Sequence, residues 1–461
     1  MNTTFKNLTL TAVLLSFSVS ARASAGVEEL LRKIKDPVKA AELKALAASD
    51  TKSAKNLLAE ALRTDKDSGY RCSAIEALGA NKDAAIAKEM AGLLTELDPT
   101  VRDCAIRSAG ESKNEFAVEP LLFTVDIYIA SLGRKGPYEN NLKARLKAIN
   151  AIWSLGEIGD PKLMANLSRF YTEADDIIKM NLLISMGKLK KNEKAGPYLF
   201  NIAASAQETE VVRSVAFEML EKIGYPSTVI NLAPSKSAGI EKGDLIYSGG
   251  ITGTISGWVS PDLPIGHAGM FAGTETKNGK ISVVIADCVP DNFTPSGVRN
   301  IYSWYSFTHK FIYPYYGNRT TPVKPTAAQR ERLVKLALEM GKKGYKYSDT
   351  HASQKGPTEF DCVGYTEYLY EQVGLNPTDN SYETGWGWPL TPWEQFIATK
   401  PNTPGPAQSG SGSIILANKG AIAAPSQAII TRGFGSLAGA FGAAAGQAPE
   451  VNTEIQPEAV N

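Results

Sequence analysis

Cys362 stands at a position where the sequence predicts that a helix begins. The loop signal Gly356-Pro357 precedes it, Asp361 is suited to capping, and a helical pattern runs on to Gly374. A thiol in the first turn meets unpaired backbone N–H groups and the positive end of the helix dipole, which favour the thiolate. The position therefore predicts a nucleophilic cysteine with a lowered pKa. The alternative is a buried structural cysteine.

A nucleophilic thiol needs a base, and the chain contains three histidines. His267 lies in an extended segment between the small residues Gly266 and Ala268. His351 lies in the loop before the cysteine, and His309 lies in an aromatic stretch typical of packing or of a site rim. Local context favours His267 as the base, with His351 and then His309 as the alternatives.

The elements that must position these side chains differ from the rest of the chain. Residues 225–400 contain strand-like segments, such as 244–247 and 281–285, together with a predicted helix over 327–341 and another that begins near Cys362. This mixture predicts an α+β domain. If Asp287, at the end of the second strand, points into the site, the adjacent Cys288 points away, which disfavours a disulfide between Cys288 and Cys362. A zinc site is disfavoured because the paired close spacing of zinc ligands is absent from the sequence.

Two blocks of this domain resemble a known family. GYKY at 344–347 followed by FDCVG at 360–364 resembles the nucleophile region of the NlpC-type papain-like cysteine hydrolases. KGDLIY at 242–247 followed by GHAGMFAG at 266–273 is similar to the paired strands that carry their histidine. The histidine precedes the cysteine by 95 residues here, an order that resembles the circularly permuted branch of the family.

The resemblance implies a papain-like fold with Cys362 as nucleophile and His267 as base. It implies that Asp287 orients the imidazole, that Tyr347 lines the site and that Asp361 helps to bind substrate. The implied reaction is acyl transfer from an amide or ester to water, without a metal or organic cofactor. The alternatives are an acyltransferase on the same fold and a non-catalytic protein-interaction scaffold.

The residue after the cysteine bears on the substrate. Members of the family that cut cell-wall peptides usually have Asp-Cys-Ser-Gly, whereas this chain has Val363 at the serine position. Valine cannot hydrogen-bond the amino end of a peptide, and an unpaired ammonium is costly to desolvate. Trp258, Val259, Leu263 and Ile265 offer an apolar wall. We expect an apolar acyl substrate in preference to a cell-wall peptide.

Residues 27–224 carry a repeated pattern. Arg71, Arg102, Arg145, Lys179 and Arg213 recur at intervals of 31, 43, 34 and 34 residues. Each arginine has alanine at the fourth place, where Lys179 has Leu182, and each of the five precedes a glycine expected to form a left-handed helix cap. The pattern resembles HEAT repeats, which implies an all-α solenoid that presents a surface to a protein partner. An irregular helical bundle is the alternative.

Two further cysteines, Cys72 and Cys104, fall one register apart in neighbouring repeats. They are predicted either to form a disulfide or to remain two buried thiols.

The remaining segments bear on location. Residues 1–25 read as a secretory signal peptide, with Lys6, a short apolar run and small residues that allow cleavage after Ala23 or Ala25. A periplasmic or secreted, non-transmembrane protein is expected. Residues 401–461 have the composition of a disordered low-complexity tail. The 49 Lys and Arg against 48 Asp and Glu leave no charge excess to favour nucleic acid.

Overall fold

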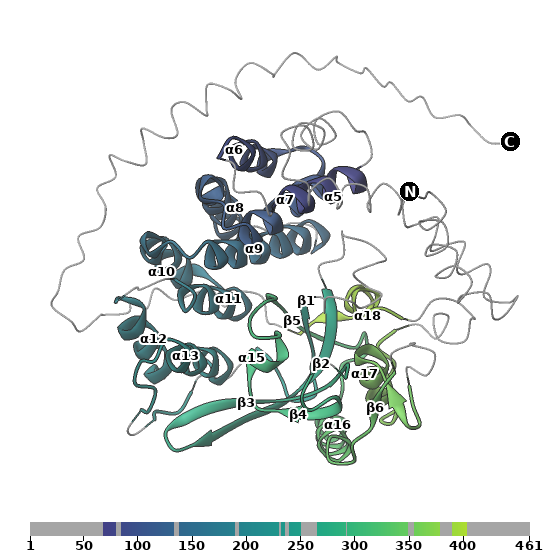
Figure 1. Ribbon diagram of the computed structural model, residues 1–461. Helices are drawn as coiled ribbons and strands as arrows, with labels where there is room; N and C mark the ends of the chain where they lie inside the picture. The colour runs from purple at the N-terminus through teal and green to yellow at the C-terminus, as the bar shows by residue number, and fades with distance from the viewer. Residues whose placement is uncertain are drawn as a thin grey trace, which may run out of the picture. The chain divides into compact units, whose positions relative to one another are not determined.

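The structure is a computed structural model that describes residues 68–79, 84–132, 138–189, 193–229, 232–235, 239–249, 265–291, 293–348, 355–378 and 390–402. The predicted signal peptide, the tail beyond residue 402, His351 and the predicted apolar wall before Ile265 lie outside these residues. Within them the chain combines a helical part with an antiparallel sheet flanked by helices (Figure 1), which confirms the mixed fold class at this level.

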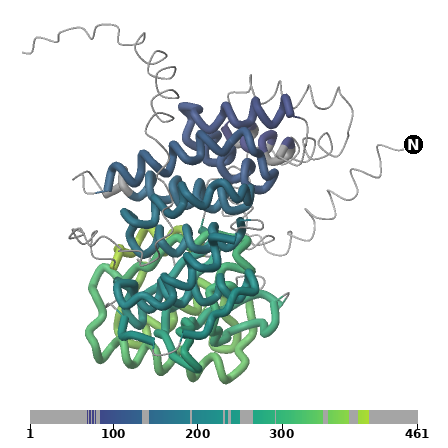
Figure 2. Tube along the Cα trace, turned by 90° about the vertical axis from the view of Figure 1, so that its left-hand side faces the viewer, coloured from purple at the N-terminus to yellow at the C-terminus, as the bar shows by residue number. Residues whose placement is uncertain are grey.

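The helical part consists of consecutive pairs of helices (Figure 1). One series, α5, α7, α9, α11 and α13, forms a continuous row in which each helix contacts the next, while α6, α8, α10 and α12 each pack against the following member of that row (Figure 2). The helices are α5 (Ser68–Gly79), α6 (Ala84–Gly92), α7 (Pro99–Glu111), α8 (Val118–Ser131), α9 (Tyr138–Ile158), α10 (Met164–Glu173), α11 (Asp176–Met186), α12 (Ala195–Ala204) and α13 (Glu210–Lys222).

A serine contact recurs along this row. Ser154 Oγ donates to the carbonyl of Ile106 at 2.7 Å, and Ser185 Oγ donates to the carbonyl of Ile152 at 2.8 Å, each bond joining one row helix to the preceding one. Cys72 and Cys104 form a disulfide between α5 and α7, which decides between the two alternatives for this pair. Equivalent positions therefore make equivalent contacts in successive helices, as a repeat requires.

The glycines of the repeated pattern have a different role from the one predicted. Gly224 has φ +71° and is left-handed, but Gly110, Gly156 and Gly187 are not among the positive-φ residues. A Cβ on Gly110 would stand 2.7 Å from Ser154 Cα, so this glycine lets two helices approach closely. The left-handed caps predicted at these three positions are wrong: Gly110 and Gly156 lie within α7 and α9, and Gly187 ends α11 with φ −69°, in the right-handed region.

Replacing Gly156 with alanine tests this packing role. The new Cβ would lie 2.7 Å from Ser185 Oγ and 2.9 Å from its Cα, so we expect a loss of about 1 to 3 kcal/mol of unfolding free energy in urea denaturation. Gly92→Ala is the matched control, because Gly92 has helical φ and ψ and a Cβ there meets nothing within 4 Å. A Gly156→Ala protein as stable as Gly92→Ala would contradict the role.

The sheet is antiparallel, with the strand order β4-β3-β2-β1-β5-β8. A separate short parallel pair is formed by β6 and β7. The predicted helices near 327–341 and from Cys362 are confirmed as α16 and α17. The elements are β1 (Leu245–Gly249), β2 (Ile265–Lys277), β3 (Lys280–Val289), β4 (Gly297–Ile301), α15 (Trp304–Phe307), β5 (Tyr315–Thr320), α16 (Ala327–Met340), β6 (Lys346–Tyr347), β7 (Glu359–Phe360), α17 (Cys362–Glu371), α18 (Pro392–Ala398) and β8 (Lys400–Pro401).

Different helices cover the two faces of this sheet near β1. Tyr247 donates its hydroxyl to Gln395 of α18 at 3.0 Å, and Gln395 in turn bonds Thr366 of α17. The next residue along β1, Ser248, donates instead to the carbonyl of Phe307 at the end of α15. Because successive side chains of a strand point to opposite faces, α17 and α18 lie on one face and α15 on the other.

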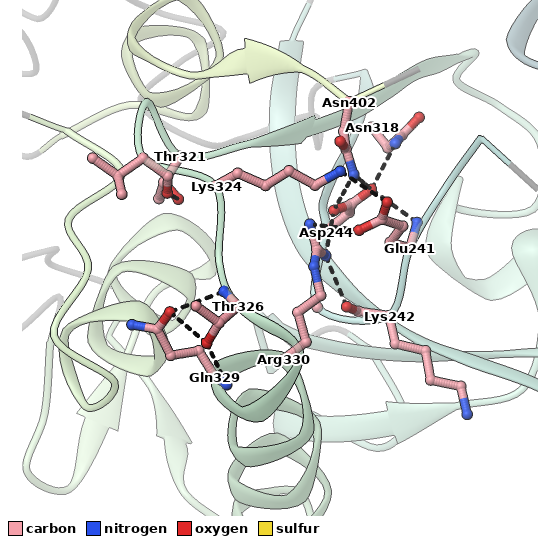
Figure 3. Close-up of polar contacts among 12 residues, drawn as sticks. Glu241, Lys242, Asp244, Asn318, Thr321, Lys324, Thr326, Gln329, Arg330 and Asn402 are labelled. Atoms are coloured by element: carbon pink, nitrogen blue, oxygen red, sulfur yellow. Dashed lines mark hydrogen bonds and ion pairs between the residues drawn. The ribbon is translucent and has the colours of Figure 1, made fainter. Parts of the chain in front are cut away.

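A buried acidic residue anchors the start of β1. Asp244 is fully buried and accepts hydrogen bonds from Arg330 of α16 at 2.7 Å, Asn318 of β5 at 2.8 Å and Asn402 at 2.9 Å (Figure 3). Arg330 also donates to the carbonyl of Lys242 at 2.8 Å. These bonds join β1, β5, α16 and the segment after β8, and so fix the strand that pairs with β2.

Candidate active site

A row of three polar side chains crosses three neighbouring strands. Asp287 of β3 pairs with Gly269 of β2 on one side and with Arg299 of β4 on the other. His267 lies two residues before Gly269, on the same face of β2. Its Nε2 is 3.1 Å from Asp287 Oδ2, and Arg299 donates to Asp287 through Nε at 2.8 Å and Nη2 at 3.0 Å. The strand register therefore brings His267 and Asp287 together.

The charges of His267, Asp287 and Arg299 interact strongly, because all three side chains are buried and little screened by water. Burial alone would raise the pKa of Asp287, but the charge of Arg299 and the hydrogen bonds from His267 and Arg299 outweigh burial and lower that pKa to about 2. An ionised Asp287 accepts the proton on Nε2 of His267, which leaves Nδ1 as the nitrogen with a lone pair. His267 Nδ1 is buried and has no hydrogen-bond partner among the described residues.

Cys362 is the first residue of α17. Asp361 caps the helix as predicted, accepting a hydrogen bond from the N–H of Gly364 at 2.6 Å. Cys362 is 6% exposed, and the backbone N–H groups of Ala268 and Val363 lie near enough to its thiol to lower the thiol pKa. Ala268 directly follows His267 in β2. The candidate nucleophile, Cys362, therefore lies against the residue next to the candidate base.

The imidazole itself faces away from α17. His267 pairs with Ser248 and its ring lies 5.1 Å from that of Phe307, on the α15 face of the sheet. Ala268 pairs with Tyr247, on the face covered by α17 and α18. In the described structure Cys362 is therefore not hydrogen-bonded to Nδ1 of His267. Hydrogen bonds of catalytic groups are often long or unmade before substrate binds.

The pKa of Cys362 shifts in the direction opposite to the one predicted from its place in the helix. Burial raises it well above the ordinary value, and the adjacent Asp361 raises it further, while the N–H groups of Ala268 and Val363 oppose this shift only in part. The helix start was expected to dominate, but α17 packs its first turn against β2, where water is excluded. The resting group is a thiol and needs a base.

Tyr347 and Cys288 both contact Phe360, which lies two residues before Cys362. Tyr347 pairs with Phe360 across β6 and β7, two residues before Cys362. Cys288 donates its thiol to the carbonyl of Phe360 at 3.1 Å, and neither Cys288 nor Cys362 is in a disulfide. Cys288 and Asp287 alternate between the sheet faces as expected, but it is the Cys288 face that carries α17.

His309, interpreted from the sequence as a packing or rim residue and as the third candidate base, packs against His267. Its ring lies 5.0 Å from that of His267 and 4.7 Å from that of Phe293, and both its nitrogens are buried without hydrogen-bond partners in the described part of the chain. The backbone is left-handed at three consecutive residues, His309, Lys310 and Phe311, with φ of 50°, 63° and 59°. Each costs roughly 1 to 2 kcal/mol, which the surrounding contacts must offset.

Arg299 was also missed, although a signal existed. It is the charged residue in the otherwise uncharged strand GVRNI, and a buried arginine needs hydrogen-bond acceptors, among which a carboxylate also balances its charge. Choosing Asp287 as that partner needs the register between β3 and β4, which the sequence does not specify.

Within the described residues, no helix is long and apolar enough to cross a membrane, and no cluster of three metal-binding side chains is present. The comparisons with known proteins do not assign the chain to a family: no protein-family model matches it, and no curated protein sequence matches it.

Proposed function

We propose that the protein is a cysteine hydrolase that cleaves an amide or ester bond of an acyl substrate. The observation that carries the proposal is the placement of Cys362 at a helix start against β2, the strand that bears His267 with its buried partners Asp287 and Arg299. A nucleophile, a base and a group that orients the base are the parts that such chemistry needs.

The proposed fold is a permuted NlpC-type papain-like domain after a HEAT-like solenoid. The six-stranded antiparallel sheet with α17 packed on it, and the histidine strand preceding the cysteine helix, support the first part. The row of helices linked by recurring serine contacts supports the second. The disulfide between Cys72 and Cys104 supports export, because such bonds persist in oxidising compartments.

The proposed reaction begins with transfer of the Cys362 proton to Nδ1 of His267. The sulfur attacks the carbonyl carbon, and the bond to the leaving nitrogen or oxygen breaks as that atom takes the proton from His267. Water then attacks the thioester, gives a proton to His267 and releases the acid, after which the proton returns to the sulfur. Asp287 stabilises the imidazolium in both steps. For this sequence Nδ1 of His267 and the Cys362 sulfur must come within hydrogen-bond distance when substrate binds, while Nε2 stays bonded to Asp287.

The substrate proposal is an apolar acyl group. Val363 follows the nucleophile and is 1% exposed, so this position offers a substrate ammonium no side-chain partner. We expect the protein to hydrolyse p-nitrophenyl octanoate and octanoyl amides faster than murein peptides, with loss of activity in Cys362→Ala and retention in Cys288→Ala. Mass spectrometry of the products with added alcohol or amine separates hydrolysis from acyl transfer. Murein cleavage alone, dependent on Cys362, would contradict the acyl preference.

A non-catalytic scaffold is the second candidate. The burial of the site favours a scaffold, since the His267 side chain is 0% exposed and its Nδ1 makes no hydrogen bond to Cys362. A scaffold predicts that the full panel of esters, amides and murein peptides stays intact and that Cys362→Ala changes none of the assays.

A further inference from the structure

Helices of the repeats hydrogen-bond both ends of the segment 303–315, which packs against His267. Trp304 of α15 donates through its indole N–H to Ser214 of α13 at 2.9 Å. Glu218, also in α13, accepts hydrogen bonds from the N–H groups of Trp304 at 2.7 Å and Tyr305 at 2.9 Å and from the hydroxyl of Ser303 at 3.0 Å. The start of this segment is therefore fixed by a helix of the repeats.

Its other end is held in the same way. Asn181 of α11 donates to the carbonyl of Tyr315 at 2.7 Å and accepts from the N–H of Tyr315 at 3.1 Å. Between these two anchors the chain makes the left-handed run that ends at Phe311 and carries His309.

Lys188, just after α11, holds that run directly. Its ammonium donates to the carbonyl of Phe311 at 2.7 Å and pairs with Glu157 at 2.5 Å. The side chain is only 9% exposed and the ammonium lies 5.5 Å from the ring centre of Trp153. A lysine is rarely buried in this way unless it is paired, and here the second contact is a backbone carbonyl in the strained run.

We propose that Lys188 is a positioning residue for the candidate site: by binding the Phe311 carbonyl it holds His309 against His267. The repeats are then part of the site rather than only a surface for a partner. This inference rests on the proposed function for its catalytic consequence, although the positioning itself is testable without turnover.

The surroundings of His309 provide the readout. His267, Asp287 and Arg299 face it from the strands, and Phe293 and Tyr313 pack against its ring. Burial, with the charge of His267 second, lowers the pKa of His309 to about 3. Held in place, His309 stays neutral across physiological pH. Released to water, it should titrate near the ordinary value of about 6.5.

The experiment uses the full-length protein labelled with ¹⁵N only in histidine, whose three imidazoles are assigned with His309→Gln and His267→Gln. In wild type the His309 signals should not move between pH 5 and pH 8. In Lys188→Met they should titrate in that range, and Lys188→Arg, which keeps a donor, should restore the wild-type behaviour. Lys162→Met, at an exposed lysine of the repeats, is the control. Circular dichroism melts establish that each variant is folded at the temperature of measurement.

The second arm is hydrolysis of p-nitrophenyl octanoate by the same variants. We expect Lys188→Met to lower kcat by about tenfold with KM within a factor of two, because misplacement of a site residue affects the chemical step more than binding. An unchanged His309 titration in folded Lys188→Met would overturn the inference. Absence of turnover in wild type would refute the proposed function and leave the imidazole result standing on its own.

Discussion

Replacing Asp287 with asparagine is expected to lower the free energy of unfolding by about 3 to 5 kcal/mol, because it leaves Arg299 charged and buried without its partner. Arg299 donates two hydrogen bonds to this carboxylate and is 4% exposed. Urea denaturation measures the loss. The double variant Asp287→Asn with Arg299→Met should recover part of it, since it removes the stranded charge as well. A loss below about 1 kcal/mol would mean that the pair is solvated.

The same pair gives stability a defined pH dependence. The pKa of Asp287 is about 2 in the folded protein against an ordinary value of 3.8, so its contribution is complete above about pH 5 and is lost as pH falls toward 2. The shift corresponds to about 2 kcal/mol. The stability difference between wild type and Asp287→Asn should therefore shrink over this range. A difference that stays constant from pH 5 to pH 2 would contradict the assigned pKa.

Replacing Cys362 with alanine is expected to reduce acyl hydrolysis by a factor of at least about 10³, because no other group takes the place of the nucleophile. His267→Gln should produce a comparable loss, and the double variant should be little worse than either alone, since the two residues act in one step. Initial rates with p-nitrophenyl octanoate measure the effect. Thermal melts of Cys362→Ala should match wild type closely, because removing one sulfur from the start of α17 leaves the Asp361 cap intact.

Additive effects of the two substitutions would indicate that Cys362 and His267 act independently. Cys288→Ala is the matched cysteine control, since its thiol bonds the carbonyl of Phe360 and has no role in the proposed steps.

Local signals in the sequence were enough to predict the helix cap before Cys362, and the family resemblance pointed to Asp287. Asp361 caps α17 because a short acidic side chain before a helix can reach the N–H groups of the first turn. Asp287 comes beside His267 because both lie on strands that pair in a hairpin, β2 to β3. These features depend on residues close together in the sequence or on one short connection.

Other features depend on contacts between distant segments and could not be predicted in this way. Cys362 has a raised pKa because α17 packs against β2, roughly a hundred residues earlier, and this burial outweighs the helix start. His309 reaches the site because Lys188 and Glu218, in the helical part, hold the segment around it. Gly110 looked like a helix end, but it is small because Ser154 of a later helix lies against it.

Cys362 is buried and His267 is not hydrogen-bonded to it, so substrate binding must bring the thiol and the imidazole together. A thiol with a raised pKa reacts slowly at neutral pH unless a base takes its proton. The imidazole is already oriented by Asp287, and its unpartnered Nδ1 is the atom that has to reach the sulfur. Activation of the nucleophile is therefore expected only after substrate binds.

Mass spectrometry of the acyl-enzyme shows whether Cys362 is the nucleophile. The full-length protein is mixed with p-nitrophenyl octanoate at neutral pH, quenched in acid within seconds and digested for peptide mapping. We expect one octanoyl group on Cys362 in wild type, much slower acylation in His267→Gln and no acylation at this position in Cys362→Ala. Octanoyl groups scattered over surface lysines, with Cys362 unmodified in wild type, would contradict this role of Cys362.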